Sequence, residues 1–263
     1  TTLLVPLLKD LQFFANWVID TENEAIAIPY LVAAGIPQTS YTVALPTELD
    51  ECDDLFILPH ADPTWTNHGA PLLNFTNSEA NGGNQGWVWS GCHAVSVLEA
   101  LFDPNNSSIK TNFLSIDPVP PPTVNDPTQD GFGLINFNDH ADASGTSAQY
   151  QTAFPRDPFM QFMGTTYGAH EGGSEQIFIP NVGGGWRPTT KIAAWDPNQA
   201  DITDPSNAGR AAMIAFGYAF GDPDAGQVMY EGGHRLDNGT AEENIAAIRA
   251  FLNFSFDAPQ NKA

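Results

Sequence analysis

Short apolar segments separated by polar turns run along the first part of the chain, and their spacing predicts alternating strands and helices. Residues 41–45 have the character of a strand, and residues 55–58 are apolar throughout, as in a strand buried on both faces of a parallel sheet. A helical pattern over 25–35 starts after a Thr-x-x-Glu capping sequence at Thr21 and ends at Gly35. This alternation is typical of an α/β fold.

The clearest local pattern is a strand followed almost at once by a helix. Residues 86–90 predict the strand and residues 94–102 a compact helix, with only Gly91, Cys92 and His93 between them. Such a turn raises a side chain above the carboxyl edge of a sheet and directs backbone N–H groups toward it. Cys92 is therefore a candidate nucleophile, since this setting favours the thiolate. The alternative is that Cys92 is a small buried hydrophobic residue.

The second half of the chain is less regular. An irregular insertion is predicted at about 103–185, with short strands at 133–137 and 176–179. Regular patterns then return as a strand at 190–195, a β-hairpin formed by 211–220 and 227–230, and a final helix with an apolar stripe of Ile245, Ile248, Phe251 and Leu252. We expect residues 1–263 to form one domain.

Composition and charge narrow the classes of function. The 263 residues are 42% hydrophobic, and 9 Lys and Arg against 31 Asp and Glu give a net charge of −22. This charge repels nucleic-acid phosphates and anionic membrane surfaces, so neither is an expected partner. No apolar run reaches the roughly 18 residues of a membrane span. An acidic surface poor in Lys favours a secreted or cell-surface protein, and the start at Thr1 suggests a processed protein or part of a longer one.

Several polar residues near the C-terminus could complete a site around Cys92. His234 directly follows a predicted strand, where a parallel sheet would receive a general base. Glu231 and Asp237 are candidates to orient its imidazole, with solvated loop carboxylates as the alternative. The histidine next to the cysteine, His93, is a candidate for substrate contact, with simple packing against the sheet as the alternative.

Three segments together resemble the class I glutamine amidotransferase-like superfamily, which includes the DJ-1/PfpI and trehalose-utilisation-type domains. They are Leu-Phe-Ile-Leu-Pro-His ending at His60, Gly-Trp-Val-Trp-Ser-Gly-Cys-His-Ala around Cys92, and Gly-Gln-Val-Met-Tyr-Glu-Gly-Gly-His ending at His234. The resemblance implies a flavodoxin-like parallel sheet with helices on both faces, a cysteine at a tight elbow and a histidine after a late strand. His60, at the end of the first of these segments, is a further candidate for substrate contact.

Two departures from the family pattern bear on function. Glutaminase domains have a Glu two residues after the histidine, where this chain has Leu236, and the elbow has Ala94 where a glycine is usual. We therefore expect a non-catalytic module with a structural or binding role in an extracellular assembly. Its partners would be further copies of itself or other domains of a larger surface protein. The alternative is a Cys-His hydrolase or amidase acting on a small molecule or peptide.

The remaining candidate ligands are cysteines and acidic loops. Cys52 and Cys92 would stand at opposite ends of the sheet, roughly 15–20 Å apart, so we predict two free thiols. No organic cofactor is expected. Calcium is the candidate ion for two oxygen-rich loops, one containing Asp139 and Asp142 and the other Asp222 and Asp224. The histidines, His68 among them, are too dispersed along the chain to predict a zinc site.

Overall fold

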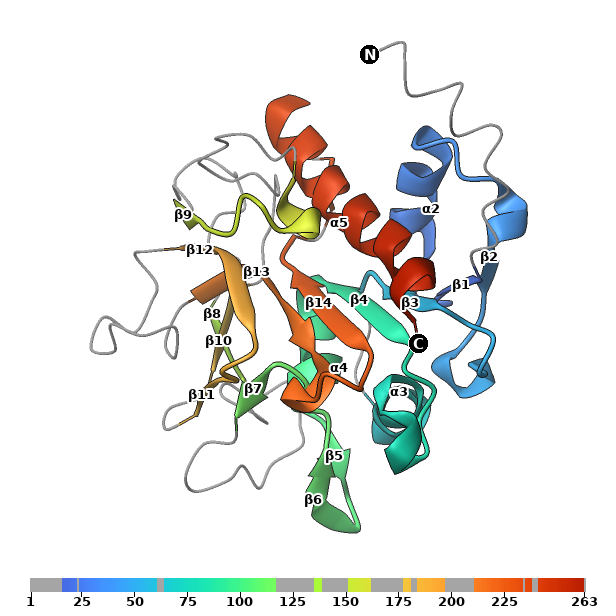
Figure 1. Cartoon of the computed structure of the whole chain (residues 1–263), viewed down its shortest axis with the longest axis vertical. Helices are drawn as coiled ribbons and strands as arrows, with labels where there is room; N and C mark the ends of the chain where they lie inside the picture. The colour runs from blue at the N-terminus through green and yellow to red at the C-terminus, as the bar shows by residue number, and fades with distance from the viewer. Residues whose placement is uncertain are drawn as a thin grey trace.

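The computed structural model contains a ten-stranded sheet with helices packed on both faces (Figure 1). The structure describes residues 16–116, 135–138, 151–161, 177–180, 184–196, 211–237 and 241–262, apart from Asn23, residues 61–63 and His234.

Five neighbouring strands are parallel and form the half of the sheet that defines the fold. They are β1 (Trp17–Ile19), β2 (Tyr41–Val43), β3 (Leu55–Leu58), β4 (Trp87–Gly91) and β14 (Gln227–Glu231). Their spatial order is β2-β1-β3-β4-β14, and each adjacent pair runs parallel. Within this half the order is 2-1-3-4-5, the doubly wound order of flavodoxin-like proteins. The predicted α/β class is confirmed, although the sequence pattern did not predict β1.

The other half of the sheet is antiparallel. It consists of β13 (Ala211–Tyr218), β10 (Ile177–Pro180), β8 (Ile135–Asn138), β12 (Lys191–Asp196) and β9 (Gln151–Thr152). β13 pairs antiparallel with β14, which confirms the predicted hairpin, and also pairs with β10 and β12. The short strands predicted at 133–137 and 176–179 correspond to β8 and β10. They pair with each other and extend the central sheet, so part of the predicted insertion belongs to the core architecture.

Four short strands make two small additional sheets. β5 (Phe102–Asp103) pairs with β6 (Asn106–Lys110), and β7 (Ser115–Ile116) pairs with β11 (Gly185–Trp186).

The helices cover the sheet because alternate residues of each strand point to opposite faces. On β3, Leu55 and Ile57 face α2 (Glu24–Ala33) and α5 (Ala241–Asn261), while Phe56 and Leu58 face the other side. That other side is covered by α3 (Ala70–Thr76), α4 (Val95–Glu99) and a π-helix, η3 (Trp65–Gly69). Short 3₁₀ turns are η1 (Gln38–Ser40), η2 (Pro46–Glu48), η4 (Glu79–Asn81), η5 (Cys92–Ala94), η6 (Pro158–Met160) and η8 (Ala219–Gly221).

The end of α2 agrees with its sequence signal. Gly35 has a φ of 78°, in the left-handed region that glycine adopts without strain. The Ile36 N–H donates to the Leu31 carbonyl oxygen, as in a Schellman motif. Gly35 therefore ends the helix as predicted.

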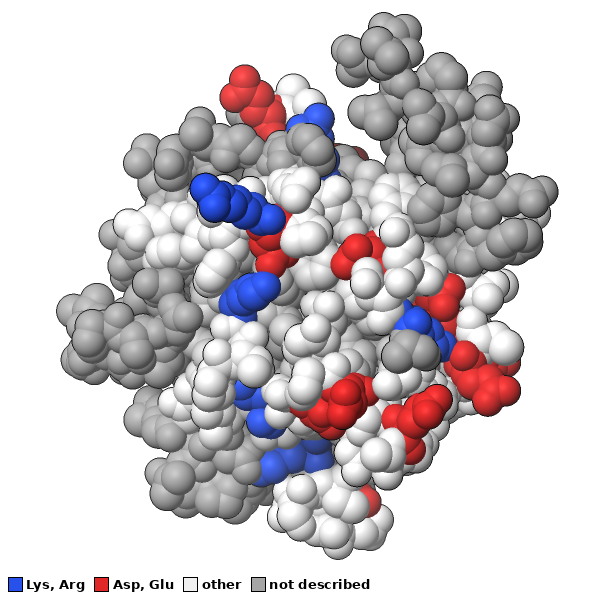
Figure 2. All heavy atoms as spheres, viewed as in Figure 1, with Lys and Arg blue, Asp and Glu red and all other residues white. Residues whose placement is uncertain are grey.

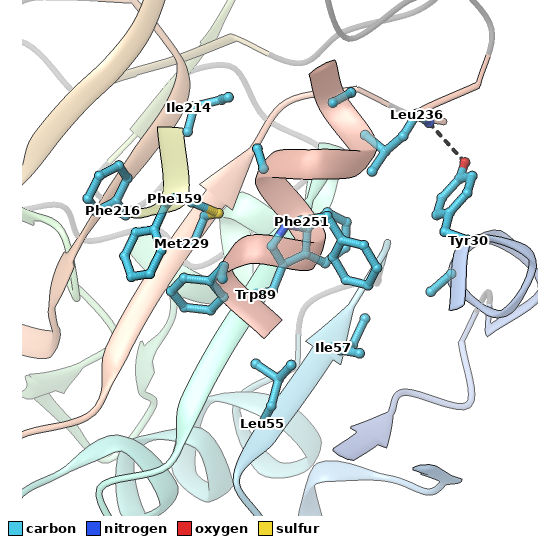
Figure 3. Packing of buried hydrophobic residues seen from close by; sticks show 14 of the residues in the cluster. Tyr30, Leu55, Ile57, Trp89, Phe159, Ile214, Phe216, Met229, Leu236 and Phe251 are labelled. Carbon is cyan, nitrogen blue, oxygen red and sulfur yellow. Dashed lines mark hydrogen bonds between the residues drawn. The ribbon is translucent and has the colours of Figure 1, made fainter. Parts of the chain in front are cut away.

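The predicted apolar stripe of α5 is confirmed at Phe251, which is buried, and at Ile248 and Leu252, which pack against the core, but it is wrong at Ile245. Ile245 is 51% exposed, whereas the residues packed on the sheet include the small Ala246, Ala247 and Ala250. Alanines let the helix axis approach the sheet closely, and aromatic rings fill the remaining space (Figure 3). Phe251 packs edge-on against Trp89 with ring centroids 4.8 Å apart.

Candidate functional site

The carboxyl ends of the parallel strands meet along one edge of the sheet, where open α/β folds bind their ligands. Asp20 follows β1, His60 lies just beyond β3, Cys92 follows β4, and Glu231 is the last residue of β14. The tertiary structure thus brings two carboxylates, an imidazole and a thiol to one edge.

Cys92 is the first residue of η5, in a strained turn directly after β4. Its φ is 44°, in the left-handed region that a residue with a Cβ rarely adopts, and none of its surface is exposed. Sparsely populated backbone conformations are concentrated at functional sites. The backbone at Cys92 therefore has the conformation of the predicted elbow, and the Cys92 thiol is buried.

Both cysteines are free thiols, as predicted. Cys92 is buried and Cys52 is exposed. They flank opposite ends of the adjacent strands β3 and β4, so no disulfide joins them.

Glu231 is fully buried and held by a tryptophan. The Trp89 indole Nε1–H donates to Glu231 Oε2 at 3.0 Å. Trp89 belongs to the hydrophobic cluster beneath α5. Tyr230, the residue before Glu231, belongs to the cluster on the opposite face of the sheet. Glu231 accordingly projects toward the α5 side, where Trp89 binds it.

Asp237 is bound by an arginine. Arg235 donates to both carboxylate oxygens, from Nε at 2.8 Å and from a terminal nitrogen at 2.9 Å. The Tyr30 hydroxyl lies 3.5 Å from Asp237 and accepts the Leu236 N–H at 2.9 Å (Figure 3). Burial raises the pKa of the Tyr30 phenol, and the nearby Asp237 charge adds to the shift. These contacts tie the loop after β14 to α2.

Some predicted site residues lie outside the description. His234, Asp139 and Asp142 are not among the described residues, and the His93 side chain is also not described. The fit between His234 and Cys92 thus stays a prediction. His60 is described and half-buried.

The Asp222 and Asp224 loop stands at the amino end of β14, at the opposite edge of the sheet from Cys92. Asp222 Oδ1 accepts the Asp224 N–H at 3.0 Å, a local turn bond. In the part of the chain that the structure describes, this pair does not belong to a group of three or more acidic, His or Cys ligands. Calcium binding there stays a prediction.

A second buried carboxylate lies behind the elbow, on α4. Glu99 is fully buried and accepts from the Leu114 N–H at 2.8 Å, the Ser115 N–H at 3.0 Å and the Ser115 hydroxyl at 2.6 Å. Burial raises the pKa of Glu99 to about 8, although these donors and the charge of Arg187 lower it. The carboxylate joins α4 to the start of β7 and the residue before it.

Sequence analysis missed a three-residue group at the same edge. Asp20, Glu22 and His68 each place one ligand atom so that all three atoms lie within 4.8 Å of one another. The group escaped notice because β1 was not predicted and His68 is far away in the sequence. A usable signal was present, since Trp-Val-Ile-Asp is an apolar run that ends in a carboxylate just before a helix.

Comparisons with known proteins give no family. No protein-family model matches the chain, and no curated protein matches it. The class of the protein therefore rests on its flavodoxin-like sheet order.

Among the described residues no helix combines the length and the apolar character needed to cross a bilayer.

Proposed function

We propose that this chain is a non-catalytic, class I glutamine amidotransferase-like module with a structural or binding role in an extracellular or cell-surface assembly. The observation that carries the proposal is the complete burial of Cys92. Reactive cysteines occupy electropositive and partly exposed surroundings, whereas buried structural cysteines are inert. The elbow then serves to pack β4 against α4.

The two candidate carboxylates support the same conclusion. Glu231 accepts from Trp89 and Asp237 from Arg235, so each has a structural partner of its own. A carboxylate that orients a catalytic imidazole must accept from that imidazole. The displaced acid in the sequence and these contacts both favour a site that has lost the arrangement of a glutaminase.

The extracellular setting is supported by charge. The net charge is −22, and acidic side chains gather over part of the face shown in Figure 2. Such a surface keeps the module soluble and repels anionic partners. Partners with cationic patches, or acidic copies bridged by cations, would match it electrostatically.

One observation favours a second candidate, a Cys-His hydrolase. The left-handed backbone at Cys92 is the geometry of a nucleophile elbow, and an inert cysteine gains nothing from the strain. In this case the Cys92 thiolate would attack an amide or ester carbonyl and form a thioester. His234 would protonate the leaving group, and Glu231 or Asp237 would orient the His234 imidazole. Water would then hydrolyse the thioester and release the carboxylic acid.

Alkylation of the folded protein separates the two candidates. Iodoacetamide labelling would be followed from pH 5 to 9 by peptide mass spectrometry, with the exposed Cys52 as the internal comparison. We expect Cys52 to react at once and Cys92 to react only after denaturation. Labelling of folded Cys92 with a midpoint well below the free-thiol value of ~8.5, lost in His234→Ala, would establish the hydrolase instead.

A further inference from the structure

We propose that Asp20, Glu22 and His68 bind a divalent transition-metal ion of the zinc class at the carboxyl end of β1. This site is separate from Cys92 and does not depend on either candidate function. The inference rests on two buried ligand atoms that face each other without a hydrogen bond.

Asp20 and His68 are both fully buried. Asp20 Oδ2 and His68 Nε2 lie 3.4 Å apart, yet within the described structure neither atom has a hydrogen-bond partner. A buried polar atom without a partner costs about 1–3 kcal/mol, and more when it is charged. A cation bound between Asp20 Oδ2 and His68 Nε2 would therefore compensate the burial of both atoms.

The remaining polar atoms of both side chains hold them in this orientation. Asp20 Oδ1 accepts the Glu22 N–H at 2.6 Å, which leaves Oδ2 to face His68. His68 Nδ1 lies 3.5 Å from the Thr64 hydroxyl. A contact at the second ring nitrogen is how proteins fix the tautomer and angle of a metal-binding histidine.

The separation of the ligand atoms fits one small ion. Zinc binds nitrogen and oxygen at about 2.0–2.2 Å, so two ligands of a tetrahedral ion stand roughly 3.3–3.6 Å apart. The Asp20–His68 pair already has this separation, at 3.4 Å. The Glu22 carboxylate lies within 4.8 Å of both and is only half-buried, so a small rotation completes the set.

The donor types favour zinc over calcium. One imidazole with two carboxylates suits zinc and related transition metals, whereas calcium takes six to eight oxygen ligands. Three protein ligands leave a fourth position for water or for a ligand from a partner.

The structural elements that carry Asp20 and His68 also support a functional metal site. His68 lies on η3, and π-helical turns are rare and frequent at functional sites. Asp20 is anchored to β3 by its N–H, which donates to the Ile57 carbonyl oxygen at 2.9 Å. The ion would therefore connect the β1–α2 turn with η3.

The test is Zn²⁺ titration of the chelator-treated full chain by isothermal titration calorimetry. We expect one ion per chain, with Kd weakened by at least about 100-fold in Asp20→Asn and in His68→Gln, since loss of even a supporting contact weakens metal affinity 10–100-fold. Glu79→Gln is the matched control, because it replaces an exposed carboxylate outside the proposed ligand set by an amide and should leave the Kd unchanged. Circular dichroism of each metal-free variant shows whether it folds.

X-ray absorption of the wild-type zinc complex keeps the proposal testable if a variant fails to fold. We expect one imidazole and only nitrogen or oxygen neighbours at about 2.0–2.2 Å. A sulfur neighbour at about 2.3 Å would overturn the proposal by placing the ion on a cysteine. Absence of binding by the wild type, or equal binding by Asp20→Asn and His68→Gln, would overturn it too. None of these outcomes depends on the reactivity of Cys92.

Discussion

Two of the fully buried carboxylates among the described residues, Glu99 and Asp20, differ in how their oxygens are satisfied. Both side chains are fully buried. Glu99 accepts three hydrogen bonds, from the Leu114 N–H and from the N–H and hydroxyl of Ser115. Asp20 accepts one on Oδ1, while its Oδ2 faces the His68 Nε2. Glu99 and Asp20 are therefore equally buried but differ in how many hydrogen bonds their oxygens accept.

This difference distinguishes Glu99, a carboxylate with a structural role, from Asp20, a carboxylate suited to bind an ion. The hydrogen bonds that Glu99 accepts offset part of the free-energy cost of its desolvation. Glu99 therefore joins two segments of the chain without an ion. Asp20 Oδ2 lies 3.4 Å from another potential ligand atom, His68 Nε2, without a hydrogen bond, so the proposed cation would compensate both atoms. Satisfaction of the lone pairs, more than burial, distinguishes the two sites.

Removal of the Glu99 carboxylate should have the largest effect. Glu99→Ala leaves the buried N–H groups of Leu114 and Ser115 without acceptors, and we expect the free energy of unfolding to fall by about 3–5 kcal/mol. Urea denaturation followed by circular dichroism measures this loss. Glu99→Gln keeps one acceptor oxygen and should lose less. A loss under about 1 kcal/mol for Glu99→Ala would show that water replaces the carboxylate.

Zinc should stabilise the protein through Asp20. At a free Zn²⁺ concentration of 100 times Kd, the free energy of unfolding should rise by about 2.7 kcal/mol, because the ion binds only the folded state. Asp20→Asn should gain no more than about 0.4 kcal/mol, because its Kd is at least about 100-fold weaker, and Glu99→Gln should gain as much as the wild type. Thermal melts with and without Zn²⁺ check this pattern. An equal gain in Asp20→Asn would remove the distinction between the two carboxylates.

The pH dependence of stability should expose Glu99. Burial raises its pKa to about 8 from an ordinary value of 4.5, so the folded state holds this proton more tightly than the unfolded state does. The stabilisation is complete below about pH 4.5 and is lost as the pH rises to about 8. Urea unfolding between pH 5 and 8 should show the wild type losing up to about 1 kcal/mol per pH unit relative to Glu99→Gln. A pH-independent difference between the two proteins contradicts the assignment.

Asp20→Asn without metal should have the smallest effect. The asparagine oxygen can still accept the Glu22 N–H, and its amide can donate to His68 Nε2. We expect the free energy of unfolding to change by less than about 1 kcal/mol in chelator. A large loss in urea denaturation would mean that Asp20 is a structural carboxylate like Glu99.

Local sequence patterns were enough to predict most of the elements. The all-apolar segment 55–58 became β3, the hairpin became β13 and β14, and Gly35 ended α2. The elbow at Cys92 was also predictable, because a strand and a helix separated by three residues leave the backbone little choice. These features depend on neighbours in the chain, which the sequence displays directly.

Tertiary structure alone decided the rest. β1 has three residues and became recognisable only between β2 and β3, whose pairing buries it. Strands β8 and β10 were expected in an insertion, but they extend the central sheet. The α5 stripe was correct except at Ile245, which the packing of the helix on the sheet leaves exposed while neighbouring alanines are buried.

The candidate site divides in the same way. The sequence by itself determined which residue types were available, namely a cysteine at a turn, late carboxylates and scattered histidines. Asp237 binds Arg235, which is only two residues away in the chain. Only the fold decided that Glu231 binds Trp89 and that His68 meets Asp20. Both of these contacts join segments that are far apart in the chain. Their geometry follows from strand order and from the packing of η3, which no local pattern encodes.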